Sequence, residues 1–244
     1  VVGRDGRLTG PELSEALISG LIESGCHVVN IGMVPSPVVY FATHTKAATS
    51  GVMITGSHNP AEYNGLKIMI AGETLSAEKI QSLYTRILEN DFKTGSGTST
   101  SINIDQDYIN TIKSDINREK ELNIVIDCGN GVAGNIAPQL FEALGVKLSK
   151  LFCLVDGRFP NHHPDPSKPK NLEDLILIQN KYRSIINQLK NLNKQYEFLK
   201  KKRWCPIGEV IFDLNQIPST GLSISSDDVE SLSVEQDNFW FSNE

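Results

Sequence analysis

The stretch GVMITGSHNP, residues 51–60, joins a short apolar run to a loop of polar residues. An apolar run of this length, bounded by turn residues, is typical of a strand buried in a sheet. Ligands of open α/β sheets usually bind beyond the carboxyl ends of the strands. Gly56 permits a sharp turn there, and the Asn-Pro pair that ends the stretch fixes a second turn. The loop therefore presents the hydroxyl of Ser57, beside His58, where α/β proteins bind their ligands.

The residues around this stretch alternate between predicted helices and predicted strands. Pro11 opens an amphipathic helix, and residues 26–32 form a strand after it. Residues 66–70 form a strand that returns from the Ser57 loop, and this strand could bring the ammonium group of Lys67 toward the serine. Strands separated by helices indicate an α/β domain with a largely parallel sheet.

A run of small polar residues, TGSGTSTS at 94–101, is typical of a flexible linker. We therefore place a linker at residues 96–104, between a first domain at residues 1–95 and a second, partial α/β domain at residues 105–180. The predicted elements of the second domain are a strand at 122–127, a helix at about 132–144, a strand at about 146–155, an ordered loop at 160–169 and a helix that starts at Asn171.

The charge pattern changes abruptly after about residue 180. Residues 181–203 hold eight Lys or Arg and one Glu, whereas residues 204–244 hold no Lys or Arg and eight Asp or Glu. Such opposite blocks indicate that residues 181–244 are an appended, foreign-looking tail that is mainly helical or irregular. The basic half is an amphipathic helix whose apolar stripe consists of Tyr182, Ile185, Ile186, Leu189, Leu192, Tyr196 and Leu199. We interpret it as a solvated helix, although such a helix can also bind a membrane or a protein partner.

The composition excludes several classes of protein. With 244 residues, 39% of them hydrophobic, the chain can form one large or two small domains with normal cores. Its net charge of −6 argues against a large nucleic-acid-binding face. No apolar run approaches the roughly 20 residues that span a bilayer, and the first residues lack the layout of a signal peptide. The cysteines form no C-x-x-C pair, so we interpret them as buried free thiols of a cytoplasmic protein. They are Cys26, Cys128, Cys153 and Cys205.

From the residues alone, the Ser57 loop is also consistent with an ordinary polar turn in which the serine caps the backbone. A serine hydrolase is disfavoured because the Gly-x-Ser-x-Gly pattern is absent. Adjacent serine and histidine residues, moreover, rarely face each other as nucleophile and base.

Two further motifs suggest other chemistry. The glycines of residues 129–134 (GNGVAG) follow a predicted strand, and Asp156 lies 22 residues after the last of them, which fits the fingerprint of an NAD-binding domain. This interpretation is disfavoured because Asp156 is followed by a turn. His162, His163 and Asp165 could suggest a metal site, but adjacent histidines seldom bind one ion, so we favour a structural loop.

Residues 55–60 resemble the phosphoserine loop of the α-D-phosphohexomutases, the phosphoglucomutase/phosphomannomutase family. Four other segments are similar to family signatures, in the family's order and spacing, from the first residue to about residue 179. These segments are 2–7 (VGRDGR), 64–67 (NGLK), 127–134 (DCGNGVAG) and 156–166 (DGRFPNHHPDP). The resemblance implies two consecutive phosphohexomutase-type α/β domains, the first without its opening strand.

The resemblance also implies an activity. In this family a phosphoryl group moves reversibly between C1 and C6 of a hexose phosphate, here through a phosphorylated Ser57 and a hexose 1,6-bisphosphate intermediate. Lys67 matches the family's proton-transfer lysine, although it could serve only as an electrostatic partner of the phosphate. By the same analogy His58 belongs to the catalytic residues, by shaping the loop or, as the less favoured alternative, by a direct chemical role, and Arg7 and Asn59 bind phosphate. For Arg7, a structural salt bridge is an equally good interpretation.

The expected metal site is incomplete. In the family, Mg²⁺ is held by an oxygen of the phosphoserine and three aspartates, and of these contacts only Ser57 is present. The resemblance ends near Gln179, and residues 180–244 contain no counterpart of the metal loop or of the third and fourth domains, which choose the hexose and bind phosphate. We therefore expect a truncated phosphohexomutase, from a disrupted gene, a fusion or a partial protein, with little or no activity by itself. The alternative is a non-catalytic remnant that binds sugar phosphate or, through residues 181–203, a protein partner.

Overall fold

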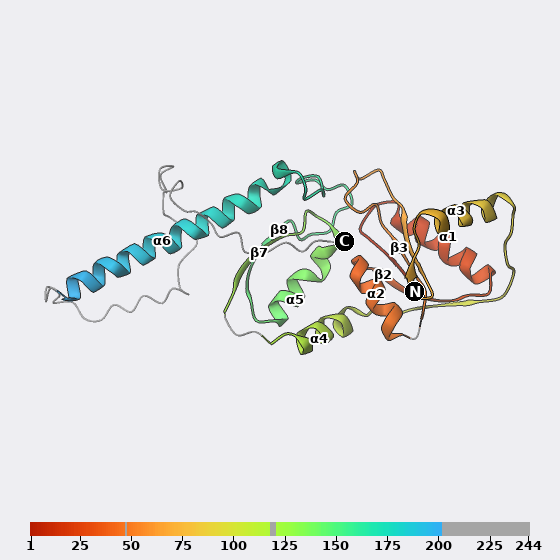
Figure 1. Cartoon of the computed structure of the whole chain (residues 1–244), viewed down its shortest axis with the longest axis horizontal. Helices are drawn as coiled ribbons and strands as arrows, with labels where there is room; N and C mark the ends of the chain where they lie inside the picture. Colours follow the sequence, from red (N-terminus) through yellow and green to blue (C-terminus); the bar gives the residue numbers. More distant parts are fainter. Residues whose placement is uncertain (47, 118–120, 202–244) are drawn as a thin grey trace. The chain divides into compact units, whose positions relative to one another are not determined.

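The computed structural model describes residues 1–46, 48–117 and 121–201 (Figure 1). Residues 1–175 form one compact unit, and the residues from Ile176 onward belong to a second unit. The acidic half of the predicted tail, residues 204–244, lies outside the described residues. Within the described ranges, no helix combines the length and the apolar character that crossing a membrane requires.

A six-stranded sheet organises the first part of the chain. Its strands lie in the order β5-β4-β3-β1-β2-β6, with bounds β1 (Val2–Arg4), β2 (His27–Met33), β3 (Gly51–Ile54), β4 (Leu66–Ile70), β5 (Glu73–Thr74) and β6 (Thr98–Ser101). β1 runs parallel to β2 and β3, and β6 runs parallel to β2. β4 and β5 are antiparallel to their neighbours because the chain returns from β3 through a loop and not through a crossover helix. The sheet is therefore largely parallel, as the sequence predicts, and β4 is the strand that runs in the opposite direction.

Helices cover both faces of this sheet. α1 (Gly10–Glu23) packs on one face through Leu17, Ile18, Leu21 and Ile22. α2 (Ser36–Thr45) packs on the other face through Val38, Val39 and Ala42. The neighbouring residues Met53 and Ile54 of β3 belong to different clusters, one under each helix, as the two-residue period of a strand requires. A third helix, α3 (Ala77–Leu88), buries none of its residues.

The segment predicted as a flexible linker contains an ordered strand. Residues 98–101 pair in parallel with residues 27–30 of β2, and the Thr98 hydroxyl lies 3.0 Å from Nδ1 of His27. Residues 98–101 of the predicted linker at 96–104 therefore form an ordered strand and not a flexible stretch. All four residues of β6 are exposed, because an edge strand needs only backbone partners. Small polar residues can form these backbone hydrogen bonds, so their composition does not distinguish an edge strand from a linker.

A second α/β substructure begins with α4 (Asp105–Asp115). β7 (Asn123–Asp127) and β8 (Lys147–Leu151) form a parallel two-stranded sheet, connected by the 3₁₀ helix η1 (Val132–Asn135) and by α5 (Ala137–Ala143). The single helix predicted at 132–144 is thus divided. The division falls just before Pro138, whose ring does not fit the interior of a continuous helix.

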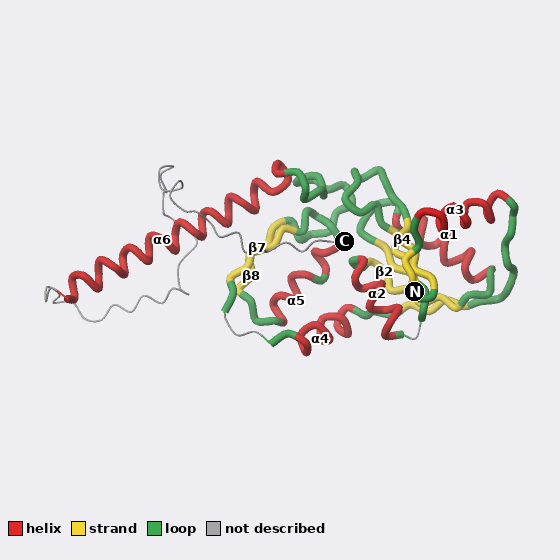
Figure 2. The backbone as a smooth tube through the Cα atoms, viewed as in Figure 1, coloured by secondary structure: helices red, strands yellow, loops and turns green. Residues whose placement is uncertain are grey.

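A long loop follows β8 and leads to the 3₁₀ helix η2 (Pro169–Leu172), as the tube in Figure 2 shows. The strand predicted to reach residue 155 ends at Leu151. The loop, residues 152–168, includes the segment that was predicted to be ordered but without regular structure.

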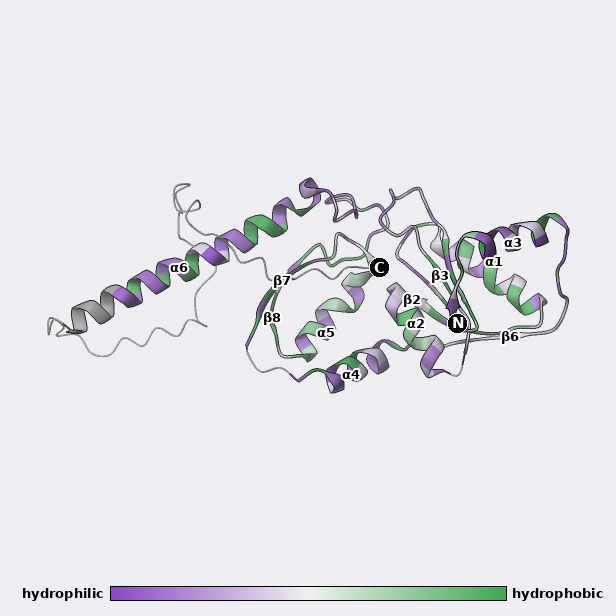
Figure 3. Cartoon of the chain, viewed as in Figure 1, coloured by the Kyte–Doolittle hydropathy of each residue, from purple (hydrophilic) through white to green (hydrophobic). Residues whose placement is uncertain are grey.

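α6 (Glu173–Lys201) is one helix of 29 residues. It contains both the helix predicted to start at Asn171 and the described part of the basic helix predicted at 181–203. Hydrophobic and hydrophilic residues alternate along it (Figure 3). Its large exposed apolar side chains include Ile176, Leu177, Tyr182, Ile186 and Leu192.

The close approach of β6 to the turn before β2 provides a test of this fold. A Cβ atom on Gly97 would lie 1.9 Å from the carbonyl oxygen of Cys26. Gly97→Ala must push the two backbones apart, so we expect it to lower the free energy of unfolding in urea by about 1–3 kcal/mol. Gly20→Ala is the matched control, because open space surrounds Gly20 and alanine favours a helix by up to about 1 kcal/mol. Equal denaturation midpoints for Gly97→Ala and the unaltered chain would contradict the position of β6.

Candidate functional site

The Ser57 loop begins at the carboxyl end of β3, beside the carboxyl end of β1. The two strands are parallel, with Arg4 opposite Ile54, so the segments that follow them leave the sheet at the same edge. The N–H group of Asp5 donates to the carbonyl oxygen of Ile54 over 2.9 Å and joins the two segments. The loop thus leaves the edge at which open α/β sheets bind ligands, as its sequence predicted.

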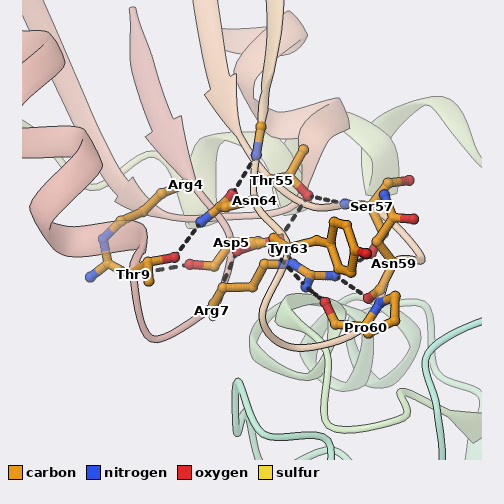
Figure 4. A network of polar contacts seen from close by, with 11 residues as sticks. Arg4, Asp5, Arg7, Thr9, Thr55, Ser57, Asn59, Pro60, Tyr63 and Asn64 are labelled. Carbon is orange, nitrogen blue, oxygen red and sulfur yellow. Dashed lines mark hydrogen bonds and ion pairs between the residues drawn. The ribbon is translucent and has the colours of Figure 1, made fainter.

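Arg7 anchors this loop from the inside. Its side chain is 0% exposed, and its guanidinium group is surrounded by backbone carbonyls of the loop (Figure 4). Nη2 donates to the carbonyl oxygens of Ser57 at 2.9 Å and Asn59 at 2.8 Å. Nη1 donates to the carbonyl oxygen of Tyr63 at 2.9 Å and to that of Pro60. A single buried side chain therefore fixes the backbone at four positions of the loop.

Asp5 completes the set of partners. Nε of Arg7 donates to Oδ2 of Asp5 over 3.2 Å, so all five N–H donors of the guanidinium are used within the protein. The same Oδ2 accepts a hydrogen bond of 2.7 Å from the hydroxyl of Thr55. The hydroxyl oxygen of Thr55 in turn accepts one of 2.9 Å from the N–H group of Ser57. A continuous chain of hydrogen bonds thus connects the buried carboxylate to the backbone of the candidate serine.

These contacts correct the expectation that Arg7 binds phosphate. The guanidinium is buried and has no N–H group left for a ligand, because each donor already has a protein acceptor. The alternative interpretation, a structural ion pair, describes its contact with Asp5. The four carbonyl contacts were not predicted, since no sequence pattern indicates which backbone groups a buried arginine will reach.

Gly56 provides the room that this anchor needs. A Cβ atom at this position would lie 2.5 Å from both Cζ and Nε of Arg7, and 2.6 Å from the carbonyl oxygen of Tyr63. The next residue, Ser57, has a left-handed φ of 53°, a conformation that costs a non-glycine residue about 1–2 kcal/mol. The surrounding hydrogen bonds maintain this turn, and the serine side chain is exposed as a result.

The outer side of the loop carries the other predicted site residues. Ser57, His58 and Asn59 are consecutive and exposed. Lys67 is also exposed and lies on β4 opposite Met53, one residue before the end of the strand that leads to the loop. The β3–β4 hairpin therefore places Lys67 beside β3, the strand that leads into the Ser57 loop. Within the described part of the chain, no hydrogen bond or ion pair joins Lys67 to Ser57.

A loop of the second α/β substructure packs on the Arg7 anchor. Cζ of Arg7 lies 5.1 Å from the ring centre of Phe159, a cation–π contact. A Cβ atom on Gly157 would lie 2.5 Å from the carbonyl oxygen of Gly6 and 2.8 Å from Cα of Arg7. This segment resembles a family signature, but the sequence does not indicate its contact with Arg7, because the two are distant in the sequence.

The glycine motif at 129–134 is explained by packing within the chain. A Cβ atom on Gly129 would lie 2.9 Å from Cε1 of His162. Nε2 of His162 lies 3.1 Å from Oδ2 of Asp127, and Oδ1 of Asp127 accepts a hydrogen bond of 2.8 Å from the N–H group of Gly129. The space beside the first glycine is thus filled by the protein's own histidine, which argues against a dinucleotide there.

Asp156, the residue that an NAD site would direct at a ribose, is paired with Arg158. Nε of Arg158 donates to Oδ1 over 2.8 Å, and Nη2 donates to Oδ2 over 2.6 Å. These hydrogen bonds lower the pKa of Asp156 to about 2. The carboxylate is therefore ionised at neutral pH and held by its neighbour, which further disfavours the NAD interpretation.

The described residues do not assemble a metal site. His162 faces Asp127, and Nδ1 of His163 accepts the N–H group of Asp165 at 3.2 Å, so the proposed ligand trio does not converge on one point. Across residues 1–46, 48–117 and 121–201, no group of three His, Cys, Asp or Glu side chains could hold an ion. For the Mg²⁺ expected from the resemblance these residues supply only Ser57, so they do not fit a complete site and we assign no step to the metal.

The fold and the loop define a class of protein: an α/β/α domain with an exposed serine on an arginine-anchored loop, followed by a second α/β domain. Models of the phosphoglucomutase/phosphomannomutase family match both parts, the α/β/α domain I at residues 1–94 and the α/β/α domain II at residues 106–187. The chain belongs to the α-D-phosphohexomutase family, and it matches the N-terminal domains I and II of the family's proteins. The second match ends at residue 187, within α6, and so extends beyond residue 180, the end that the sequence predicts for this domain.

Relatives show how much of the family this portion represents. The chain is 57% identical over 175 residues to the phosphomannomutase/phosphoglucomutase of Pseudomonas aeruginosa, and 51% identical over 177 residues to the phosphoglucomutase of Neisseria meningitidis. Each alignment covers 72% of this chain and 38% of the relative. The crystal structure of a phosphoglucomutase/phosphomannomutase family protein from Burkholderia thailandensis matches with a TM-score of 0.70 at 47% identity, over 72% of this chain and 40% of that one. The chain thus spans less than half the length of these relatives.

The arginine anchor predicts a large effect of one substitution. Arg7→Met leaves the carboxylate of Asp5 buried without its cation, so we expect the free energy of unfolding to fall by about 3–5 kcal/mol. Hydrogen exchange at the amide of Asn59 should accelerate together with this loss, because the backbone of the loop loses four hydrogen bonds. Urea denaturation and hydrogen-exchange mass spectrometry measure the two effects.

The matched control for this prediction is Arg86→Met. Arg86 lies on α3 and pairs with Asp91 in an exposed contact of 2.8 Å, so its loss should cost less than about 1 kcal/mol. If Arg7→Met is as stable as Arg86→Met, Arg7 is not the anchor of the loop.

Proposed function

We propose that Ser57 is a phosphoryl carrier: its Oγ takes a phosphoryl group from a hexose 1,6-bisphosphate and transfers one to a hexose monophosphate. The observation that carries the proposal is the exposure of Ser57 on a loop whose backbone is held by a buried arginine. Family membership supports it, because the relatives are phosphoglucomutases and phosphomannomutases.

Two requirements of phosphoryl transfer are met by different residues in this proposal. A phosphoserine carries a charge of about −1.5 to −2, and its reaction depends mainly on positioning and on charge neutralisation. Arg7 contributes positioning, because it holds the backbone on both sides of His58. It cannot neutralise the phosphate, since its donors are all engaged. The candidates for that task are Lys67 and the N–H and amide groups of the exposed loop, including Asn59.

Proton transfer must accompany the phosphoryl shuttle. When the Oγ–P bond of Ser57 forms, the hydroxyl proton leaves, and it returns when the bond breaks. We assign this proton to the amine of Lys67, on the strand paired with β3, and we assign His58 to shaping the loop. Mg²⁺ bound to the phosphoserine remains an expectation of the family resemblance.

Phosphorylation of Ser57 tests the proposal directly. We expect the chain, incubated for hours with glucose 1,6-bisphosphate or mannose 1,6-bisphosphate, to gain the mass of one phosphoryl group on the peptide that contains Ser57. Ser57→Ala should abolish the gain, whereas Ser96→Ala, which removes another exposed loop serine, should leave it unchanged. Labelling of a different residue, or none at all in the unaltered chain, would contradict the proposal.

We expect mutase turnover by this chain to be slow, even if Ser57 can be phosphorylated by a hexose 1,6-bisphosphate. We propose that this chain alone has little mutase activity, because a divalent cation supplies several kcal/mol to such a transition state and the described residues cannot hold one by themselves. At about 1.4 kcal/mol for each factor of ten, its kcat/KM for glucose 1-phosphate should lie about 100- to 10,000-fold below that of the Pseudomonas aeruginosa relative. A coupled assay with Mg²⁺ measures both proteins, and a value within tenfold of the relative would refute the claim.

A second function is favoured by the surface of α6. Leu177 is 67% exposed and Leu192 is 52% exposed on this basic helix, which suits a protein partner better than solvent. In this alternative the chain is a non-catalytic remnant that binds sugar phosphate or a partner. Turnover that Ser57→Ala abolishes would exclude it. A cytoplasmic location, expected from the free thiols, belongs to both proposals.

A further inference from the structure

Two cysteines that are 25 residues apart in the sequence lie side by side at the ends of β7 and β8. Cys128 directly follows β7, and Cys153 lies two residues after β8. Their Sγ atoms are 3.4 Å apart. Both residues are partly buried, and both are free cysteines. The sequence suggested isolated thiols because their separation along the chain matches no short cysteine motif.

The parallel pairing of β7 and β8 creates this contact. Asp127 is paired with Leu151 in the register, and the N–H group of Cys128 donates to the carbonyl oxygen of Leu151 over 3.1 Å. Continued by one residue, this register places Phe152 opposite Cys128, and Cys153 follows it with its Sγ 3.4 Å from Sγ of Cys128. A bond requires the sulfurs to approach to about 2.05 Å, which a side-chain adjustment in this partly buried position can provide.

We propose that Cys128 and Cys153 are a reversible disulfide site, oxidised by a low-molecular-weight disulfide such as glutathione disulfide. The proposal goes beyond phosphoryl transfer and does not depend on it. No residue of the Ser57 loop takes part in the reaction.

The chemistry balances as two thiol–disulfide exchanges. The thiolate of Cys153 attacks one sulfur of glutathione disulfide, which releases the first glutathione thiolate and leaves a mixed disulfide on Cys153. The sulfur of Cys128 then attacks Sγ of Cys153, the second glutathione leaves, and the proton of Cys128 goes to solvent or to the leaving thiolate. In total, two cysteine thiols and one glutathione disulfide give one protein disulfide and two glutathione thiols.

The order of attack follows from the environment of the two thiols. Burial raises the pKa of the Cys128 thiol, and the contact with Cys153 raises it further. A thiol whose pKa is raised is rarely a thiolate at neutral pH, so Cys128 is a poor first nucleophile. It can still act as the second one, because its Sγ lies 3.4 Å from Sγ of Cys153, the atom that it must attack.

The bond would join the turn after β7 to the loop that leads from Cys153 to the Arg7 anchor. The turn after Cys128 contains Asn130, whose side-chain amide donates to the carbonyl oxygen of Leu154 over 2.9 Å. The loop after Cys153 continues to Phe159, whose ring lies against Arg7. Oxidation would therefore add a covalent tie to a connection that hydrogen bonds already make.

The test is a redox titration of the full chain. The protein is equilibrated at neutral pH in buffers of graded glutathione to glutathione-disulfide ratio, quenched with acid, alkylated and mapped by mass spectrometry. The expected result is a loss of two of the four titratable thiols, with a peptide linked through Cys128 and Cys153, reversed by dithiothreitol. In urea, the peptide linked through Cys128 and Cys153 should be no more abundant than peptides linked through other cysteine pairs. The reason is that unfolding removes the pairing of β7 and β8 that brings the two sulfurs together.

Matched variants make the outcome decisive. Cys26→Ser removes an exposed thiol away from the pair and should leave the Cys128–Cys153 link intact. Cys128→Ser and Cys153→Ser should each abolish the link, and Cys128→Ala and Cys153→Ala repeat the comparison in case serine disturbs folding. Separate glutathionylation of Cys128 and Cys153, a dominant link to another cysteine, or two thiols that remain reduced throughout the titration would each overturn the proposal.

Discussion

The buried guanidinium of Arg7 is the interaction on which the candidate site depends. It connects a carboxylate after β1 to four backbone carbonyls in the loop after β3, and the ring of Phe159 lies against it. A buried cation with five donors is stable only when each donor has an acceptor, so this arrangement specifies one path for the loop. Because the backbone is held from the inside, the side chains of Ser57, His58 and Asn59 can face outward.

Much of the first domain could be predicted because burial imposes a visible period on the sequence. The apolar residues of α1 recur at helical spacing, and β3 is a short apolar run, so both were recognised. β6 was missed for the opposite reason: its residues are exposed, and it exists as a strand because the backbone of β2 is available beside it. No local pattern records the availability of a partner strand.

The same distinction applies to the candidate site. The turn at Ser57 was recognisable because glycine and proline restrict the backbone locally, whatever surrounds them. The roles of Arg7 and of the Cys128–Cys153 pair depend on which strands lie side by side and in what register. Family resemblance placed Arg7 near the loop but assigned it to a ligand. The structure assigns it to the loop's own carbonyls.

The central claim is that the Arg7 anchor positions Ser57 for phosphoryl transfer. The most direct measurement is the initial rate at which a hexose 1,6-bisphosphate phosphorylates Ser57 in Arg7→Lys, which keeps the positive charge but offers three donors where arginine offers five. Under conditions in which both proteins are folded, we expect a rate at least tenfold below that of the unaltered chain. An unchanged rate would contradict it, because the loop would then need only a positive charge and not the fork of arginine.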